Sequence, residues 1–382
     1  MKKIAKWIAI CMVAIMALFA FGCDNGSSDS TPPHYDDFIG GDPTGGNPDD
    51  GNPVGGNPNE DDSNEDDSVY NGVLIVDLNN MVVGYRSEKF PEDGIIEIPE
   101  VIIGIREKAF YRCMDLKSVK IGGSVSIEDN AFFDCENLES VTIGGSLDRV
   151  GDSAFEMCIN LKSVTIGYDG YDIEEDKDSE SWHLDFIGKK AFYMCTSLKS
   201  MTICYGVNKI KSFAFYGCTS LESVNIPRTV RTIENEAFTF CKSLKSVTIP
   251  DGVTVINGGV FSDCTSLISV DMPDSVEYIG GSAFSNCSSL TSVDIPSNVA
   301  TIYPGAFSSC TALLYVKIPV SVTTIGDNVF ADCTSFEKVV YEGTVADWNT
   351  NIGQVHSKSI FKGTENPTIE CSDGSIIISV GD

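Results

Sequence analysis

From about residue 100 onward, hydrophobic and polar positions recur with a fixed period. The unit over residues 244–264 reads L-x-x-V-x-I-P-x-x-V-x-x-I-x-x-x-V-F-x-x-C. Val247 and Ile249 alternate with polar residues, which is the pattern of a short strand with one buried face. Pro250 follows and ends the strand, because proline has no N–H to donate to a sheet ladder. Each unit therefore predicts one short strand followed by a turn and further inward-facing residues.

The sequence Ala-Phe-x-x-Cys, or its Val-Phe-x-x-Cys variant, marks ten copies of this unit. The cysteine spacings are 22, 23 and 37 residues, and then 23 residues six times. The cysteines of the ten copies are Cys113, Cys135, Cys158, Cys195, Cys218, Cys241, Cys264, Cys287, Cys310 and Cys333. A single unit exposes its hydrophobic residues above and below, so the units must stack to bury them. We predict a repeat solenoid of about ten coils, with a parallel sheet of one short strand per ~23-residue coil.

These motifs resemble the BspA-type, or Treponema-type, leucine-rich repeat. The resemblance covers about residues 85–345 and rests on the Leu-x-x-Val-x-Ile run and on Ala-Phe-x-x-Cys. It implies an arc whose concave face is lined by the strands. It also implies a surface protein of the kind found in anaerobic bacteria and some protists, several of which attach to host matrix proteins or to other cells.

The pattern divides the chain into five parts. Residues 1–22 are the expected signal peptide, 23–68 a disordered acidic tether rich in Gly, Asn and Pro, and 69–100 an N-terminal cap. The repeat array occupies 101–340, with an insertion near 168–184, and a C-terminal cap occupies 341–382. Caps are expected because the open ends of a stacked sheet would otherwise pair with other chains.

The N-terminus resembles a bacterial lipoprotein signal. Three lysines precede an apolar run of fifteen residues, Trp7–Phe21, which is short for a membrane span. Gly22 precedes Cys23, and this lipobox-like junction implies cleavage before Cys23 and lipidation of that residue. Ala20 stands where the motif prefers Leu, so a plain signal peptide or an uncleaved anchor is the alternative.

The formal net charge of −29 opposes binding to nucleic acid and to anionic lipid, because both would be repelled. Attraction to basic proteins and simple solubility are the two remaining explanations. Residues 24–68 contain thirteen Asp or Glu and no Lys or Arg, which favours a solvated spacer. The alternative of a metal site lacks the spacing of a calcium loop.

The cysteine column predicts buried, reduced thiols. Equivalent residues in adjacent coils lie with parallel Cβ vectors about 4.8 Å apart, whereas a disulfide needs converging vectors and Cβ atoms about 3.8 Å apart. Bridges along the array are the alternative that export would suggest. Zinc is not expected, since no C-x₂₋₄-C pair exists.

Two surfaces are candidates for ligand binding. The first is the strand face, where a nearly invariant Ser column is best explained as structural and a neighbouring column varies between copies. The strand-face candidates are Lys120, Thr142, Thr165, Thr202, Asn225, Thr248, Asp271, Asp294, Tyr315 and Lys317. The second is the insertion, whose candidates are Tyr168, Tyr171, Trp182 and His183. Aromatic residues often anchor interfaces, but an acidic loop is equally explained as a solvated bulge.

The sequence gives no indication of catalysis. It contains three histidines, and none lies in H-E-x-x-H; a G-x-S-x-G motif, a P-loop and a G-x-G-x-x-G motif are also absent. We therefore expect no enzyme, no cofactor and no metal. The function expected is a lipid-anchored protein of the cell envelope, exposed on the outer membrane, that binds a protein partner such as host matrix or other cells. The alternative is a periplasm-facing structural or scaffold lipoprotein with no host ligand.

Overall fold

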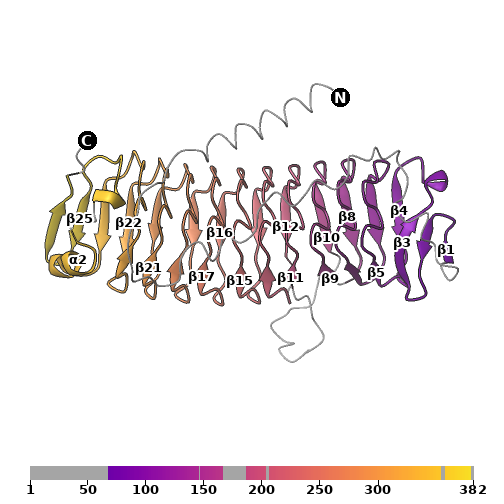
Figure 1. Cartoon of the computed structure of the whole chain (residues 1–382), viewed down its shortest axis with the longest axis horizontal. Coiled ribbons are helices and arrows are strands. Elements are labelled where there is room, and N and C mark those ends of the chain that lie inside the picture. The colour runs from indigo at the N-terminus through magenta and orange to yellow at the C-terminus, as the bar shows by residue number, and fades with distance from the viewer. Residues whose placement is uncertain (1–67, 146, 167–185, 204–205, 354–357, 380–382) are drawn as a thin grey trace, which may run out of the picture. The chain divides into compact units, whose positions relative to one another are not determined.

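The computed structural model describes residues 68–145, 147–166, 186–203, 206–353 and 358–379. Within these ranges the chain forms a solenoid of stacked coils, each carrying two short parallel strands (Figure 1). The first strand of most coils holds the Ser-Val-x-Ile run, and that of the others holds a variant such as Tyr-Val-Lys-Ile in β22 (Tyr315–Ile318). These first strands are β4 (Ile95–Ile98), β6 (Ser118–Ile121), β8 (Ser140–Ile143), β10 (Ser163–Ile166), β12 (Ser200–Thr202), β14 (Ser223–Asn225), β16 (Ser246–Thr248), β18 (Ser269–Asp271), β20 (Ser292–Asp294), β22 (Tyr315–Ile318) and β24 (Lys338–Tyr341).

The solenoid is confirmed, but a single strand per coil is corrected to two. The second strands are β5 (Gly104–Ile105), β7 (Val125–Ile127), β9 (Leu147–Val150), β11 (Phe186–Ile187), β13 (Lys209–Ile210), β15 (Thr232–Ile233), β17 (Val255–Ile256), β19 (Tyr278–Ile279), β21 (Thr301–Ile302) and β23 (Thr324–Ile325). Neighbouring second strands pair in parallel, as Ile256 does with Ile279, except that no pairing joins β15 to β17. Most contain only two residues, which is too short for an alternating pattern to appear in the sequence.

A third row of hydrogen bonds joins the coils along the Ala-Phe-x-x-Cys segments. The N–H of Phe110 donates to the carbonyl of Ala131 at 2.8 Å, and the N–H of Arg112 to that of Phe133 at 2.7 Å. Residues on either side of the Ala-Phe pair adopt left-handed backbone, such as Lys108 with φ 60° and Arg112 with φ 55°. This conformation costs a non-glycine residue roughly 1–2 kcal/mol, so the stacking of coils must offset it.

The core is a continuous stack of phenylalanine rings. Ten rings from Phe110 to Phe330 are at most 1% exposed, and each lies parallel to the next with centroids 5.0–5.8 Å apart. Tyr85 closes the stack at its N-terminal end, 5.6 Å from Phe110, and Phe361 closes it at the other end, 5.5 Å from Phe330. The stack therefore depends on residues from both ends of the array as well as on the repeats.

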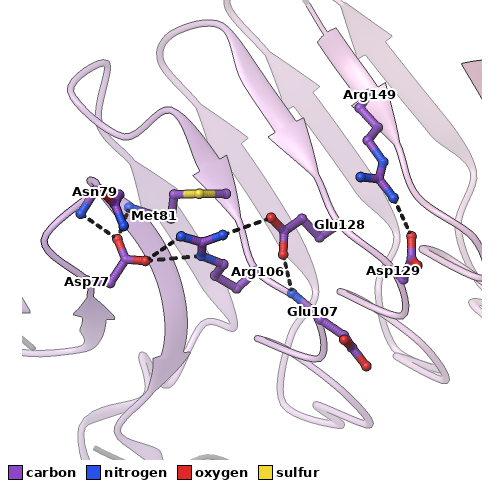
Figure 2. Close-up of polar contacts among 8 residues, drawn as sticks. All are labelled: Asp77, Asn79, Met81, Arg106, Glu107, Glu128, Asp129 and Arg149. Carbon is purple, nitrogen blue, oxygen red and sulfur yellow. Dashed lines mark hydrogen bonds and ion pairs between the residues drawn. The ribbon is translucent and has the colours of Figure 1, made fainter. Parts of the chain in front are cut away.

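The N-terminal end of the described chain is a three-stranded antiparallel unit, which we call the N-terminal hairpin, and it continues into the array. Its strands are β1 (Ser68–Tyr70), β2 (Leu74–Val76) and β3 (Met81–Tyr85), followed by the short 3-10 helix η2 (Ser87–Lys89), and β3 pairs in parallel with β5. Figure 2 shows how side chains tie the hairpin to the coils. The Arg106 guanidinium donates to Asp77 at 2.9 Å and to Glu128 at 3.1 Å. Arg106, which is half-buried, thus joins three successive layers of the solenoid.

Acidification is expected to loosen this hairpin through Asp77. Burial acts to raise the pKa of Asp77, but hydrogen bonds from the Met81 N–H and from Arg106 outweigh it and hold the pKa below its usual value. A lowered folded-state pKa stabilises the fold above the unfolded-state pKa of about 3.9, and this contribution is lost as the pH falls through the lower folded-state value. The protection factors of the amides of residues 68–85, which allow for the pH dependence of the intrinsic exchange rate, should therefore fall in that range.

The Asp77→Asn variant isolates this effect, because other carboxylates titrate in the same range. It should exchange faster than the natural chain at neutral pH and lose less protection on acidification. Equal pH dependence in the two proteins would show that Asp77 does not hold the hairpin.

The C-terminal end of the described chain covers the last coil. It consists of α2 (Val345–Asn351), β25 (Thr368–Cys371) and β26 (Gly374–Ile377), with β25 parallel to β24 and antiparallel to β26. Thr344 and Asp347 form a capping box at the start of α2, and Trp348 is fully buried. Across the described residues, no helix has the length and apolar character that crossing a membrane requires.

Candidate functional site

The strand face is the outward side of the first strands. Within each strand the second residue is turned toward the core and the third toward solvent, as in β6, where Val119 is buried and Lys120 exposed. All ten strand-face candidates are exposed: Lys120, Thr142, Thr165, Thr202, Asn225, Thr248, Asp271, Asp294, Tyr315 and Lys317. Parallel in-register pairing, such as Thr248 with Asp271, aligns them in columns, although no strand pairing joins β14 to β16 or β18 to β20. The structure therefore brings these ten residues onto one face.

In the N-terminal coils, the serine column is more buried than the varied column beside it. Ser118 and Ser140 are half-buried, and their hydroxyls are hydrogen-bonded to each other at 3.0 Å. A small side chain that bonds to its own equivalent one coil away suits a closely stacked surface. This geometry supports a structural role for the column.

A second exposed column, not recognised in the sequence, lies just before the first strands, and we call it the pre-strand column. Backbone hydrogen bonds link its members coil to coil, as from the Glu139 N–H to the Lys117 carbonyl at 2.8 Å. Its ten members, all exposed, are Lys117, Glu139, Lys162, Lys199, Glu222, Lys245, Ile268, Thr291, Leu314 and Glu337. The column could have been found in the sequence, because each member directly follows the position at which Leu recurs in the repeats.

Ion pairs neutralise much of the charge in the N-terminal coils. Glu139 and Lys162 of the pre-strand column are 2.7 Å apart, and Glu222 and Lys245 are 2.8 Å apart. The hydrogen bond and charge of each lysine hold the pKa of its glutamate partner below the usual value. On the strand face, Lys120 pairs with Glu97 of the preceding coil at 3.2 Å. Such exposed pairs contribute little to stability, but they cancel charge that a ligand would otherwise meet.

The remaining predicted site residues lie outside the described part of the chain. These are Tyr168, Tyr171, Trp182 and His183 of the insertion, and the lipidation candidate Cys23. Where the chain is described again, Phe186 is half-buried on β11, with the Arg149 guanidinium 5.6 Å and the Lys211 ammonium 3.7 Å from its ring centroid. Sequence reasoning missed this cation–π contact, because Lys211 lies one coil further along the chain.

The sequence also missed an aromatic row that lies one position after the stacked phenylalanines. Tyr111 stacks on Phe133 and Tyr193 stacks on Tyr216, each pair with centroids 5.0 Å apart. These rings are half-buried, and the row ends in the C-terminal coils, where Ser262, Ser285 and Ser308 take the same position. The described residues contain no group of three or more His, Cys, Asp or Glu that could hold a metal ion.

The ten predicted ladder cysteines are free, buried thiols in one column. Nine of them, from Cys135 to Cys333, donate the thiol proton to the carbonyl of the phenylalanine in the preceding coil at 2.9–3.3 Å. Burial raises the pKa of Cys113 and of Cys333 to about 12. The eight thiols between them are shifted in the same direction by burial.

We therefore expect the ten ladder thiols to resist alkylation while the protein is folded. The thiolate is the reactive form, and burial suppresses both its formation and its contact with reagent. Mass spectrometry after iodoacetamide treatment should find these cysteines unmodified in the native protein and modified after unfolding. Cys371 is only partly buried and should react sooner, which provides an internal control. Native labelling of the ladder, or bridges between its members, would contradict the expectation.

The repeats match a known protein family. A family model described as a BspA type leucine rich repeat region (6 copies) matches residues 94–177, 179–270 and 231–358, which together exceed half of the chain. Comparison with curated proteins found no match.

Several solved structures are similar to this chain. A leucine rich cell surface protein from Faecalibacterium prausnitzii is 24% identical, covers 76% of this chain and 99% of its own, and has a TM-score of 0.37. A leucine-rich repeat protein from Bacteroides ovatus is 20% identical, with coverage of 81% and 99% and a TM-score of 0.34. The T. pallidum leucine rich repeat protein is 18% identical, with coverage of 74% and 99% and a TM-score of 0.34.

Proposed function

This chain belongs to the BspA-type leucine-rich-repeat family, and from that premise we propose that it is a cell-surface protein that binds a protein partner through its strand face. Members of this family are often surface proteins that mediate protein interactions. The observation that carries the proposal is the exposed third-position column, which contains nine of the ten candidates, all but Tyr315, and varies between Lys, Thr, Asn and Asp while the core beneath it repeats. A varied surface on an invariant frame is suited to recognition.

The rest of the molecule is consistent with binding rather than catalysis. Leucine-rich-repeat solenoids are typically scaffolds for protein interaction. Among the described residues, packing between stacked coils explains why the cysteines and phenylalanines of the repeats are buried. We propose a function that needs no cofactor and no metal, and the net negative charge of the chain disfavours nucleic acid as a partner.

We further propose that a lipid on Cys23 holds the protein at the outer membrane, with residues 24–68 as a spacer. The supporting observations are the lysines and apolar run that precede Cys23 and the acidic composition that follows it. Acyl chains contribute about 0.8 kcal/mol per buried methylene, so more than one chain would anchor the protein stably. Metabolic labelling with a fatty-acid analogue should mark the natural chain and not the Cys23→Ser variant.

Two measurements test the surface-binding proposal. Protease shaving of intact cells should remove the protein, since only a surface-exposed protein is accessible; a periplasm-facing scaffold would be protected. The purified protein should also bind at least one member of a panel of extracellular-matrix and cell-surface proteins. Protection from shaving together with an empty panel would overturn the proposal and favour the scaffold function.

A further inference from the structure

The C-terminal coils carry unbalanced negative charge. Residues 246–316 contain no Lys, Arg or His, although they include six acidic residues. This stretch spans three whole coils, from β16 to the start of β22, whereas every coil before it contains at least one Lys or Arg. The ion pairs that neutralise the N-terminal coils are therefore unavailable here.

Two of these acidic residues occupy the strand face itself. Asp271 on β18 and Asp294 on β20 are both exposed, and neither forms a salt bridge with any residue that the structure describes. Lys317 pairs in register with Asp294, but its ammonium group binds Glu342 at 2.7 Å. Asp294 thus interacts electrostatically with Lys317 without forming an ion pair, and both carboxylates face solvent on neighbouring coils.

The pre-strand column carries no charge over the same coils, where it consists of Ile268, Thr291 and Leu314. Ile268 is 55% exposed and Leu314 is 41% exposed, at positions that carry Lys or Glu in each of the six preceding coils. Tyr315 follows Leu314, replaces the serine of the earlier copies, and is 39% exposed. Exposed apolar side chains beside carboxylates that form no ion pair are characteristic of a surface that is covered by a partner.

We propose that the patch formed by Ile268, Asp271, Asp294, Leu314 and Tyr315 docks a Lys- or Arg-containing segment of a protein partner. The inference rests on the proposed function and names the chemistry of the partner. Cationic groups of the segment bind Asp271 and Asp294, while its apolar side chains pack on Ile268, Leu314 and Tyr315. Charge complementarity excludes an acidic segment and, by the same argument, a second copy of this acidic face.

A fluorescent peptide that alternates Lys and Val is the probe, and binding to the full chain is measured by fluorescence anisotropy at low salt. We expect the Asp271→Asn, Asp294→Asn double variant to weaken binding by about tenfold. The matched control is Glu139→Gln with Glu222→Gln, which changes the net charge equally but at residues already paired with lysine. It should change the affinity by less than about twofold. A peptide that alternates Glu and Val should not bind.

The apolar part of the patch is tested separately. The Ile268→Ser, Leu314→Ser variant should weaken binding of the Lys–Val peptide by about tenfold without altering net charge. Equal losses in the aspartate variant and its matched control would mean that the probe senses total charge, and the inference would fail. Full binding by the serine variant would also overturn it.

These outcomes are distinguishable from failure of the proposed function. If a panel protein binds the natural chain and both patch variants equally, surface binding stands and this location is wrong. If no panel protein binds and shaving leaves the protein intact, the proposed function fails whatever the peptide does.

Discussion

Replacing Phe132 with Ala is expected to lower the free energy of unfolding by about 3–5 kcal/mol, the usual cost of removing a buried phenylalanine. The ring is fully buried and stacked between Phe110 and Phe155, with centroids 5.1 and 5.0 Å away. Its removal leaves a void that two neighbouring rings face from either side. Because each coil is stabilised mainly by its neighbours, the damage should spread to the adjacent coils before it reaches the far end of the array.

Phe133→Ala is the matched control, since it changes the same residue type one position away. Phe133 is half-buried and stacks on Tyr111 outside the central stack, so its loss should cost about 1 kcal/mol. Chemical denaturation gives the two free energies, and hydrogen exchange locates the loosened coils. Similar losses in the two variants would show that the stack is not the main source of stability.

Ending the chain after Tyr341 is expected to abolish the soluble monomer. This truncation removes β25, so β24 becomes an open parallel edge, and it removes Phe361 from the end of the ring stack. It also removes Trp348, which lies edge-on against Tyr341 at 5.2 Å. An exposed strand edge above an uncovered apolar layer pairs readily with other chains. Size-exclusion chromatography with light scattering should therefore detect oligomers or aggregates.

The Ile377→Ala variant is the control for this truncation, because it changes the C-terminal segment without uncovering the last coil. Ile377 lies on β26 of the same segment but is 72% exposed. Its replacement should leave the protein monomeric and shift the unfolding free energy by no more than about 0.5 kcal/mol. A truncated chain that remained monomeric with unchanged melting would show that the last coil needs no cover.

The sequence by itself determined the solenoid and its inward-facing residues. The Leu, Val, Ile, Phe and Cys positions of each copy are buried as expected, because a 23-residue period places chemically equivalent residues one above another. The exposure of the ten strand-face candidates followed from the same reasoning, since in a strand the residues on either side of an inward one face outward.

The tertiary structure alone decided how one coil acts on the next. Glu139 and Lys162 are 23 residues apart, and only the folded structure shows that they form an ion pair, whereas Asp271 has no such partner among the residues that the structure describes. The second strands and the left-handed residues beside each Ala-Phe pair could likewise not be predicted from the sequence, because they are stabilised by hydrogen bonds to a neighbouring coil and not by local propensity. Periodicity specifies which residues are equivalent. The charge that a ligand meets depends instead on ion pairs between neighbouring coils, and those pairs form only when the chain is folded.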